Sequence, residues 1–116
     1  MKKLKIIAAV MCTWATFPAN AATGTDLAGW CEHYNASGQQ SSPDGAACVG
    51  HIIEAHEAFL ALDAYKINHV CIPENWDTTQ IVLIVKEFMS KHPEELQCKG
   101  AYNVFDALAE VFPYKE

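Results

Sequence analysis

The cysteines constrain this chain more than any other feature. Five occur in 116 residues, at Cys12, Cys31, Cys48, Cys71 and Cys98. An odd count leaves one thiol without a partner. Whether the cysteines form disulfides therefore depends on how much of the chain is retained and on the compartment in which it works. The length allows one small domain with a modest core, for which covalent cross-links add much to stability.

The N-terminus has the pattern of a secretory signal peptide. Lys2, Lys3 and Lys5 precede an apolar run over residues 6–15, and Ala19-Asn20-Ala21 supplies the small residues that a signal peptidase reads. The run is shorter than the ~20 residues that span a bilayer, and a buried N-terminal helix is the alternative. We predict a signal peptide over 1–21 and a single exported domain over 22–116.

Removal of residues 1–21 would change both the charge and the cysteine count. Residues 22–116 carry five lysines, no arginine and 14 acids, a formal charge of −9, whereas the full chain carries −6. This balance argues against nucleic acid and against anionic membrane surfaces as partners. Cys12 is lost as well, and four cysteines in an exported domain predict two disulfides.

Four cysteines permit three connectivities. We favour the local pairs: Cys31–Cys48 would close the polar loop over 35–45, and Cys71–Cys98 would tie a connector to the last helix. Each bond should contribute roughly 2–4 kcal/mol.

Apolar residues recur at helical spacing in four segments, which predicts an all-α four-helix bundle stapled by disulfides. The first helix is short and lies around Leu27–Tyr34, and the second covers about 46–65. A connector over 68–76 leads to a third helix that begins at Asp77 or Thr78. The last helix follows His92-Pro93 and ends at Pro113. The expected core faces of the second and last helices are Val49, Ile52, Ile53, His56, Phe59, Leu60, Leu96, Ala101, Val104, Phe105, Leu108, Val111 and Phe112.

The third helix has more apolar surface than one core stripe requires. Ile81, Ile84, Val85 and Phe88 form the stripe, and Val82, Leu83 and Met89 lie off it. The extra face predicts an oligomer or partner interface, with these three residues at a homodimer contact. A central helix surrounded by the other three is an equally good interpretation, and a buried strand over the apolar run is a weaker one.

No sequence motif indicates a catalytic or metal-binding site. His51 and His56 are five residues apart, which does not bring them to one helix face, and no zinc-binding or nucleophile motif is present. The acids fall on polar helix faces, where solvation is the usual reason for a charge. We expect no catalytic residue, no metal site and no cofactor, so a binding protein is favoured over an enzyme.

The order of several short motifs resembles the Rap/Tai family of immunity proteins. They are Trp30-Cys31, Cys48-Val49-Gly50-His51-Ile52-Ile53, Cys71-Ile72-Pro73, Gln80, Val85-Lys86, His92-Pro93-Glu94, Ala107-Leu108 and Val111-Phe112-Pro113. Two positions depart from the family pattern: His51 replaces a usual tyrosine, and Tyr114 replaces a terminal cysteine while Cys98 appears instead. This departure implies that one disulfide is rewired.

The resemblance implies an α-helical periplasmic homodimer that does no chemistry. It would bind a peptidoglycan amidase toxin of the NlpC/P60-like Cys/His type, delivered by type VI secretion, and occlude its active-site cleft. The producing cell and its kin would be protected. We place the toxin-binding residues on the connector and the start of the third helix: His69, Glu74, Asn75, Trp76, Asp77 and Gln80. Trp76 would be the anchor, or it would close the end of the bundle.

Two other functions remain open from the sequence. An acid-stress chaperone of the periplasmic HdeA-like kind is also small, helical, exported and disulfide-bonded, and it would use its carboxylates as a pH switch. A secreted enzyme with an unrecognised site is the third hypothesis.

Overall fold

The computed structural model describes residues 22–34 and 42–114, and within them every named element is helical. The elements are α2 (Gly24–Cys31), α3 (Pro43–Ala61), α4 (Ala64–Ile67), α5 (Thr78–Lys91), the 3₁₀ helix η1 (Pro93–Gln97) and α6 (Gly100–Val111). The all-α prediction is confirmed. The predicted signal peptide, 1–21, and most of the polar loop lie outside the described residues.

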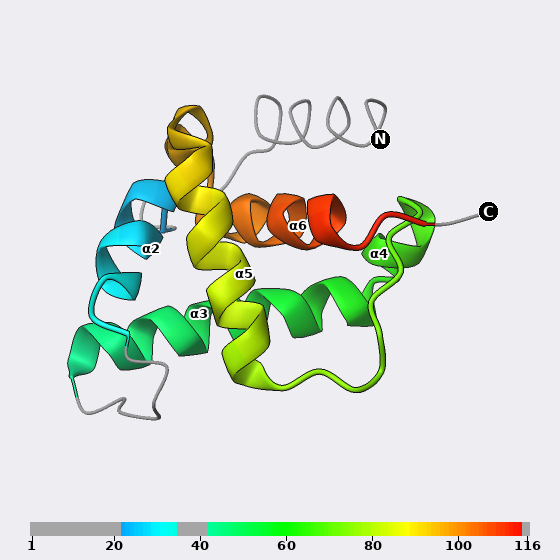
Figure 1. Ribbon diagram of the computed structural model, residues 1–116, viewed down its shortest axis with the longest axis horizontal. Coiled ribbons are helices and arrows are strands. Elements are labelled where there is room, and N and C mark those ends of the chain that lie inside the picture. Colours follow the sequence, from blue (N-terminus) through cyan, green and yellow to red (C-terminus); the bar gives the residue numbers. More distant parts are fainter. Residues whose placement is uncertain (1–21, 35–41, 115–116) are drawn as a thin grey trace.

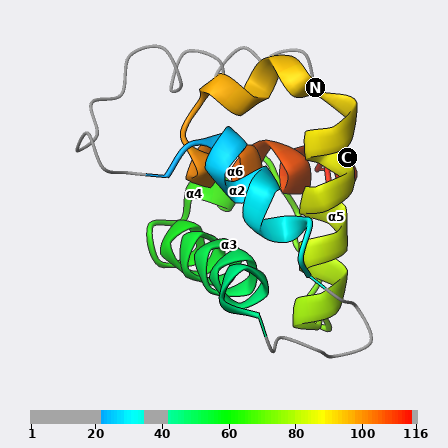
Figure 2. The ribbon, with the colours of Figure 1, turned by 90° about the vertical axis from the view of Figure 1, so that its left-hand side faces the viewer.

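The helices cross one another instead of lining up as a regular bundle. In Figure 1, α3 and α6 run in similar directions and α5 passes steeply across both. Figure 2 shows α2 at one end of this arrangement, beside α5. Helix α5 contacts α2, α3 and α6, and its other face is exposed.

Local sequence signals set where the helices begin. The Asp77 side chain accepts from the Gln80 N–H at 2.9 Å, and the Gln80 side chain accepts from the Asp77 N–H at 3.2 Å, which forms a capping box at the start of α5. Ser42 caps α3, with Pro43 at its first position. Leu96 lies in η1, so its placement in the last helix was wrong, because Pro93 begins a separate 3₁₀ helix there.

The core combines aliphatic side chains with an aromatic cluster. Leu27, Ile52, Phe105 and Leu108 are all at most 1% exposed. The Tyr65 ring stacks on Phe105 at 5.5 Å between ring centroids. Each such buried side chain contributes about 1.5–3 kcal/mol relative to an exposed one. Leu60 is 50% exposed and Val111 is 48% exposed, so the assignment of these two residues to the core was wrong, since each lies at the edge of the buried face of its helix.

Packing within the chain explains two of the extra apolar residues of α5. Val82 is fully buried and Met89 is 4% exposed, so both belong to the core of a single chain and cannot form a dimer contact. That part of the predicted interface was wrong. The alternative of a helix surrounded by the other three was wrong as well, because Leu83, Glu87 and Ser90 leave one face of α5 exposed. Leu83 is 44% exposed and remains available to a partner.

One predicted disulfide is present and the other is not. Cys31 and Cys48 are bonded, with Cα atoms 4.9 Å apart, and they join α2 to α3. Cys71 is an exposed free thiol whose N–H donates to the Phe112 carbonyl, at the C-terminal end of α6. Cys98 precedes the N-terminal end of that 12-residue helix, which is roughly 18 Å long. A disulfide needs Cα atoms within about 7 Å, so the predicted Cys71–Cys98 bond was wrong.

Two glycines of α2 make a matched test of the packing against η1. A Cβ on Gly24 would lie 2.8 Å from the Leu96 Cα, whereas a Cβ on Gly29 would meet nothing within 4 Å. We expect Gly24→Ala to lower the free energy of unfolding by about 1–3 kcal/mol through overpacking. Gly29→Ala should raise it by about 0.5–1 kcal/mol, because alanine favours a helix interior. Urea unfolding measures both, and equal effects would contradict the packing described.

Candidate binding site

The connector over 68–77 is the longest described segment that lies outside the helices. It leaves α4 through His69, which adopts a left-handed backbone with φ of 60°. The Val70 N–H donates to the Tyr65 carbonyl at 2.8 Å, and the Tyr114 N–H donates to the His69 carbonyl at 2.8 Å. In Figure 1 the connector sweeps from α4 around to the start of α5, at the edge of the molecule.

A groove of about 440 Å³ separates the connector from α3. Its apolar walls come from Ile53 and Leu60 of α3, from Ile72 of the connector and from Ile81 of α5. The remaining lining residues are His56, Glu57, Pro73, Glu74, Trp76, Asp77 and Thr78. We call this the connector groove.

Three of the six predicted binding residues line the connector groove, and three do not. Glu74, Trp76 and Asp77 line it. Asn75 is exposed on the connector, and Gln80 is engaged in the cap of α5. His69 packs against Tyr114, with ring centroids 5.9 Å apart.

The wall of the connector groove that α3 contributes was not predicted from the sequence. Ile53, Glu57 and Leu60 follow one another at i, i+4 and i+7, so they share one face of the helix. An acid inside an apolar stripe next to the core face is the signal that could have identified this wall.

Trp76 lies at the junction of the connector and the core. Its indole ring meets the Phe112 ring edge-on, with centroids 4.7 Å apart, and its Nε1 is buried without a hydrogen-bond partner among the described residues. This packing agrees with the alternative in which Trp76 closes the end of the bundle. The residue is only partly buried, so its remaining surface faces the groove.

The connector groove is acidic. Glu57, Glu74 and Asp77 line it, all exposed, and no lysine or arginine is among its lining residues. His56 is buried, and its Nδ1 lies 2.8 Å from the Tyr65 hydroxyl. Burial lowers the pKa of His56, although Glu57 acts in the opposite direction. The imidazole is therefore neutral at pH 7 and leaves the three carboxylates uncompensated.

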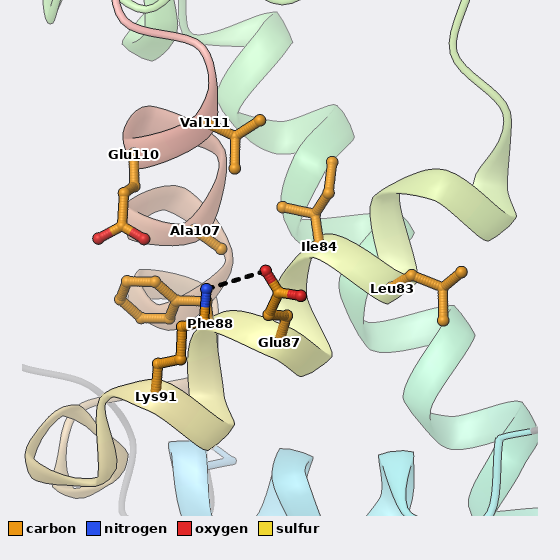
Figure 3. A pocket seen from close by; sticks show the side chains of 8 residues that line it. All are labelled: Leu83, Ile84, Glu87, Phe88, Lys91, Ala107, Glu110 and Val111. Atoms are coloured by element: carbon orange, nitrogen blue, oxygen red, sulfur yellow. Dashed lines mark hydrogen bonds and ion pairs between the residues drawn. The ribbon is translucent and has the colours of Figure 1, made fainter.

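A second, smaller groove of about 160 Å³ lies between α5 and α6. Figure 3 shows Leu83, Ile84 and Val111 around it, with the Lys91–Glu87 ion pair (3.1 Å) at its rim. Leu83 is 44% exposed and Val111 is 48% exposed. We call this the α5–α6 groove.

Comparison with known proteins identifies the family. The family model described as Rap1a immunity proteins matches residues 23–114, which is nearly all of the described chain. The chain belongs to the Rap1a immunity protein family. No curated protein and no solved structure matches it. Membership gives the protein an immunity function against an effector, and therefore an effector as its binding partner.

The described residues of this immunity protein hold neither a potential metal-binding cluster nor a helix that could span a membrane. Within residues 22–34 and 42–114, no three or more His, Cys, Asp or Glu side chains are grouped so that they could hold a metal ion. Nor is any helix in these two stretches both long and apolar enough to cross a bilayer. The two grooves are the surfaces to consider for an effector.

The buried histidine makes the stability of this immunity protein sensitive to pH. Because burial lowers the pKa of His56 in the folded chain, the unfolded chain takes up a proton first as the pH falls below about 6.5. We expect the free energy of unfolding to decrease between pH 7.5 and pH 5.5. His51, whose pKa burial also lowers, adds to this trend.

Urea unfolding over this pH range measures the effect. His56→Gln should reduce the pH dependence relative to the parent protein, because the buried imidazole is removed. An unaltered pH dependence in His56→Gln would argue against a neutral buried imidazole.

Proposed function

We propose that this Rap1a family member is a periplasmic inhibitor of a peptidoglycan amidase effector. The effector would be an NlpC/P60-like Cys/His hydrolase delivered by type VI secretion, and the immunity protein would protect the producing cell and its kin. Family membership supports the immunity function, and the resemblance of the motifs to the Rap/Tai pattern supports the amidase as the target.

The observation that carries the mode of binding is the connector with its groove. Glu74, Asn75 and Asp77 are exposed, and the connector that carries them runs along the edge of the molecule in Figure 1. Trp76 beside them supplies the kind of aromatic surface that is enriched among interface hot spots. In the proposed complex the connector lies across the mouth of the amidase cleft and keeps peptidoglycan from the catalytic cysteine.

Charge supports this placement. The domain over 22–116 carries a formal charge of −9, and the connector groove adds three local carboxylates without a balancing lysine or arginine. Such a surface would speed the approach of a basic amidase and would orient it toward the connector.

Binding to an NlpC/P60-like amidase effector of type VI secretion tests the proposal. Isothermal titration with a catalytically inactive Cys→Ser form of that amidase should give a tight one-to-one complex. The double variant Glu74→Ala/Trp76→Ala should bind at least about thirtyfold more weakly, because hot-spot side chains each cost about 2 kcal/mol or more when truncated.

The matched control is Glu32→Gln at the end of α2, an exposed acid on a helix that does not line the groove, which should bind as the parent protein does. Equal affinity of the parent protein and the double variant, with folding intact, would remove the connector from the interface.

The proposed complex contains a homodimer of the immunity protein. Its interface would use the α5–α6 groove, where Leu83, Ile84 and Val111 present apolar surface. Sedimentation equilibrium should show a dimer for residues 22–116 and a monomer for Leu83→Glu. Leu62→Glu, at a 71% exposed position outside that groove, is the control that should remain dimeric. A monomeric parent protein would refute the dimer.

Export to the periplasm is the remaining part of the proposal. It rests on the signal-peptide pattern over 1–21. N-terminal sequencing of the protein released from the periplasm should begin at Ala22, and recovery of the full-length chain from the cytoplasm would contradict it.

A further inference from the structure

We infer that the C-terminal segment Phe112–Tyr114 positions the connector for effector binding, with Phe112 as the main positioning residue. The inference rests on the function proposed above for the connector. It concerns residues that follow α6 and that do not line the connector groove.

Backbone hydrogen bonds join the C-terminal segment to the connector. The Cys71 N–H donates to the Phe112 carbonyl at 2.9 Å, and the Tyr114 N–H donates to the His69 carbonyl at 2.8 Å. Val70 and Pro113 form an isolated antiparallel bridge between these two bonds. The C-terminal segment therefore pairs with the first half of the connector as a short two-stranded ribbon.

The side chains extend this ribbon to the second half of the connector. The Trp76 ring meets Phe112 edge-on at 4.7 Å between centroids, and the Tyr114 ring lies 5.9 Å from His69. Between Ile72 and Trp76, no backbone hydrogen bond reaches another described residue. Phe112 thus touches the connector twice, through its carbonyl at Cys71 and through its ring at Trp76.

These contacts bear on binding because a connector without them would sample many conformations. A connector held in its binding conformation loses less entropy when it docks. If loosening leaves that conformation about one tenth populated, the apparent affinity falls about tenfold, although no contact with the effector has been removed.

The test separates positioning from general stability. Phe112→Ala removes the ring from Trp76, Phe112→Leu keeps part of it, and Leu96→Ala is the matched control. Leu96 is also a partly buried apolar residue, but it lies in η1, which precedes the N-terminal end of α6, whereas the connector meets the C-terminal end. All three variants are compared with the parent protein at a temperature at which each is folded.

Two measurements are made. Hydrogen exchange of the Cys71 and Tyr114 amides, without any effector, should be at least about tenfold faster in Phe112→Ala and nearly unchanged in Leu96→Ala. Affinity for the inactive amidase of the binding experiment above should fall about tenfold or more in Phe112→Ala, recover in Phe112→Leu, and stay at the parent value in Leu96→Ala.

The possible results test the positioning role and the proposed partner separately. Unchanged exchange in Phe112→Ala, or equal losses of affinity in Phe112→Ala and Leu96→Ala, would overturn the positioning role. Absence of binding by the parent protein would refute the proposed amidase partner, while the exchange result would still report on the ribbon. Should Phe112→Ala unfold, Tyr114→Ala gives the same test, because that ring is 54% exposed and contacts His69 of the connector.

Discussion

Val82→Asp should prevent the domain from folding, whereas Leu83→Asp should leave it folded. Val82 is fully buried at the centre of α5, and an isolated carboxylate placed there would lose its hydration without gaining a partner. We expect a loss of about 4 kcal/mol or more, a large part of the stability of a small domain. Leu83 is 44% exposed, and its replacement should cost less than about 1 kcal/mol.

Circular dichroism and urea unfolding of the two variants make this comparison directly. The two substitutions introduce the same residue at adjacent positions of one helix, so the introduced side chain and the net charge are matched. A Val82→Asp protein that stays folded and becomes monomeric would place Val82 at a dimer interface and would contradict its burial within a single chain.

Removal of the Cys31–Cys48 disulfide should have the second largest effect. The bond joins α2 to α3 across 17 residues of sequence, and closing a loop of that length in the unfolded chain is worth about 3 kcal/mol. The double variant Cys31→Ala/Cys48→Ala should lose about 2–4 kcal/mol of unfolding free energy, because the bond is absent. Both residues are replaced so that neither is left as an unpaired thiol.

Cys71→Ser provides the control, because Cys71 is an exposed free thiol and its replacement should change stability by less than about 0.5 kcal/mol. Thermal and urea unfolding under oxidising conditions measure both. A loss in Cys71→Ser comparable to that of the double variant would show that the free thiol has a structural role.

Local signals in the sequence predict much of this fold. The N-cap at Asp77 and the apolar periodicity of α3 and α5 place these two helices within a few residues, and the Cys31–Cys48 pair follows from the short loop it closes. The start of the last helix was wrong, because α6 begins at Gly100 and η1 occupies the preceding residues. The sequence also does not determine what covers the extra apolar residues of α5. The extra apolar face of α5 has the same pattern whether it meets another copy or the rest of its own chain.

For the candidate site, too, the sequence predicts local features but not contacts between distant segments. The connector was found from its composition and its tryptophan, but the wall formed by Ile53, Glu57 and Leu60 depends on how α3 packs against it. The Cys71–Cys98 prediction failed for a related reason: the connector returns to the C-terminal end of α6, and Cys98 precedes the other end. Such pairings between distant segments have no local signature.

The most direct test of the account is inhibition of the amidase itself. Residues 22–116 are titrated against the active form of the amidase effector used in the binding experiment, with purified peptidoglycan as the substrate. We predict that hydrolysis stops near an equimolar ratio, and that Glu74→Ala/Trp76→Ala requires at least about thirtyfold more protein for the same inhibition. Unimpeded hydrolysis in the presence of equimolar parent protein would contradict the proposed function.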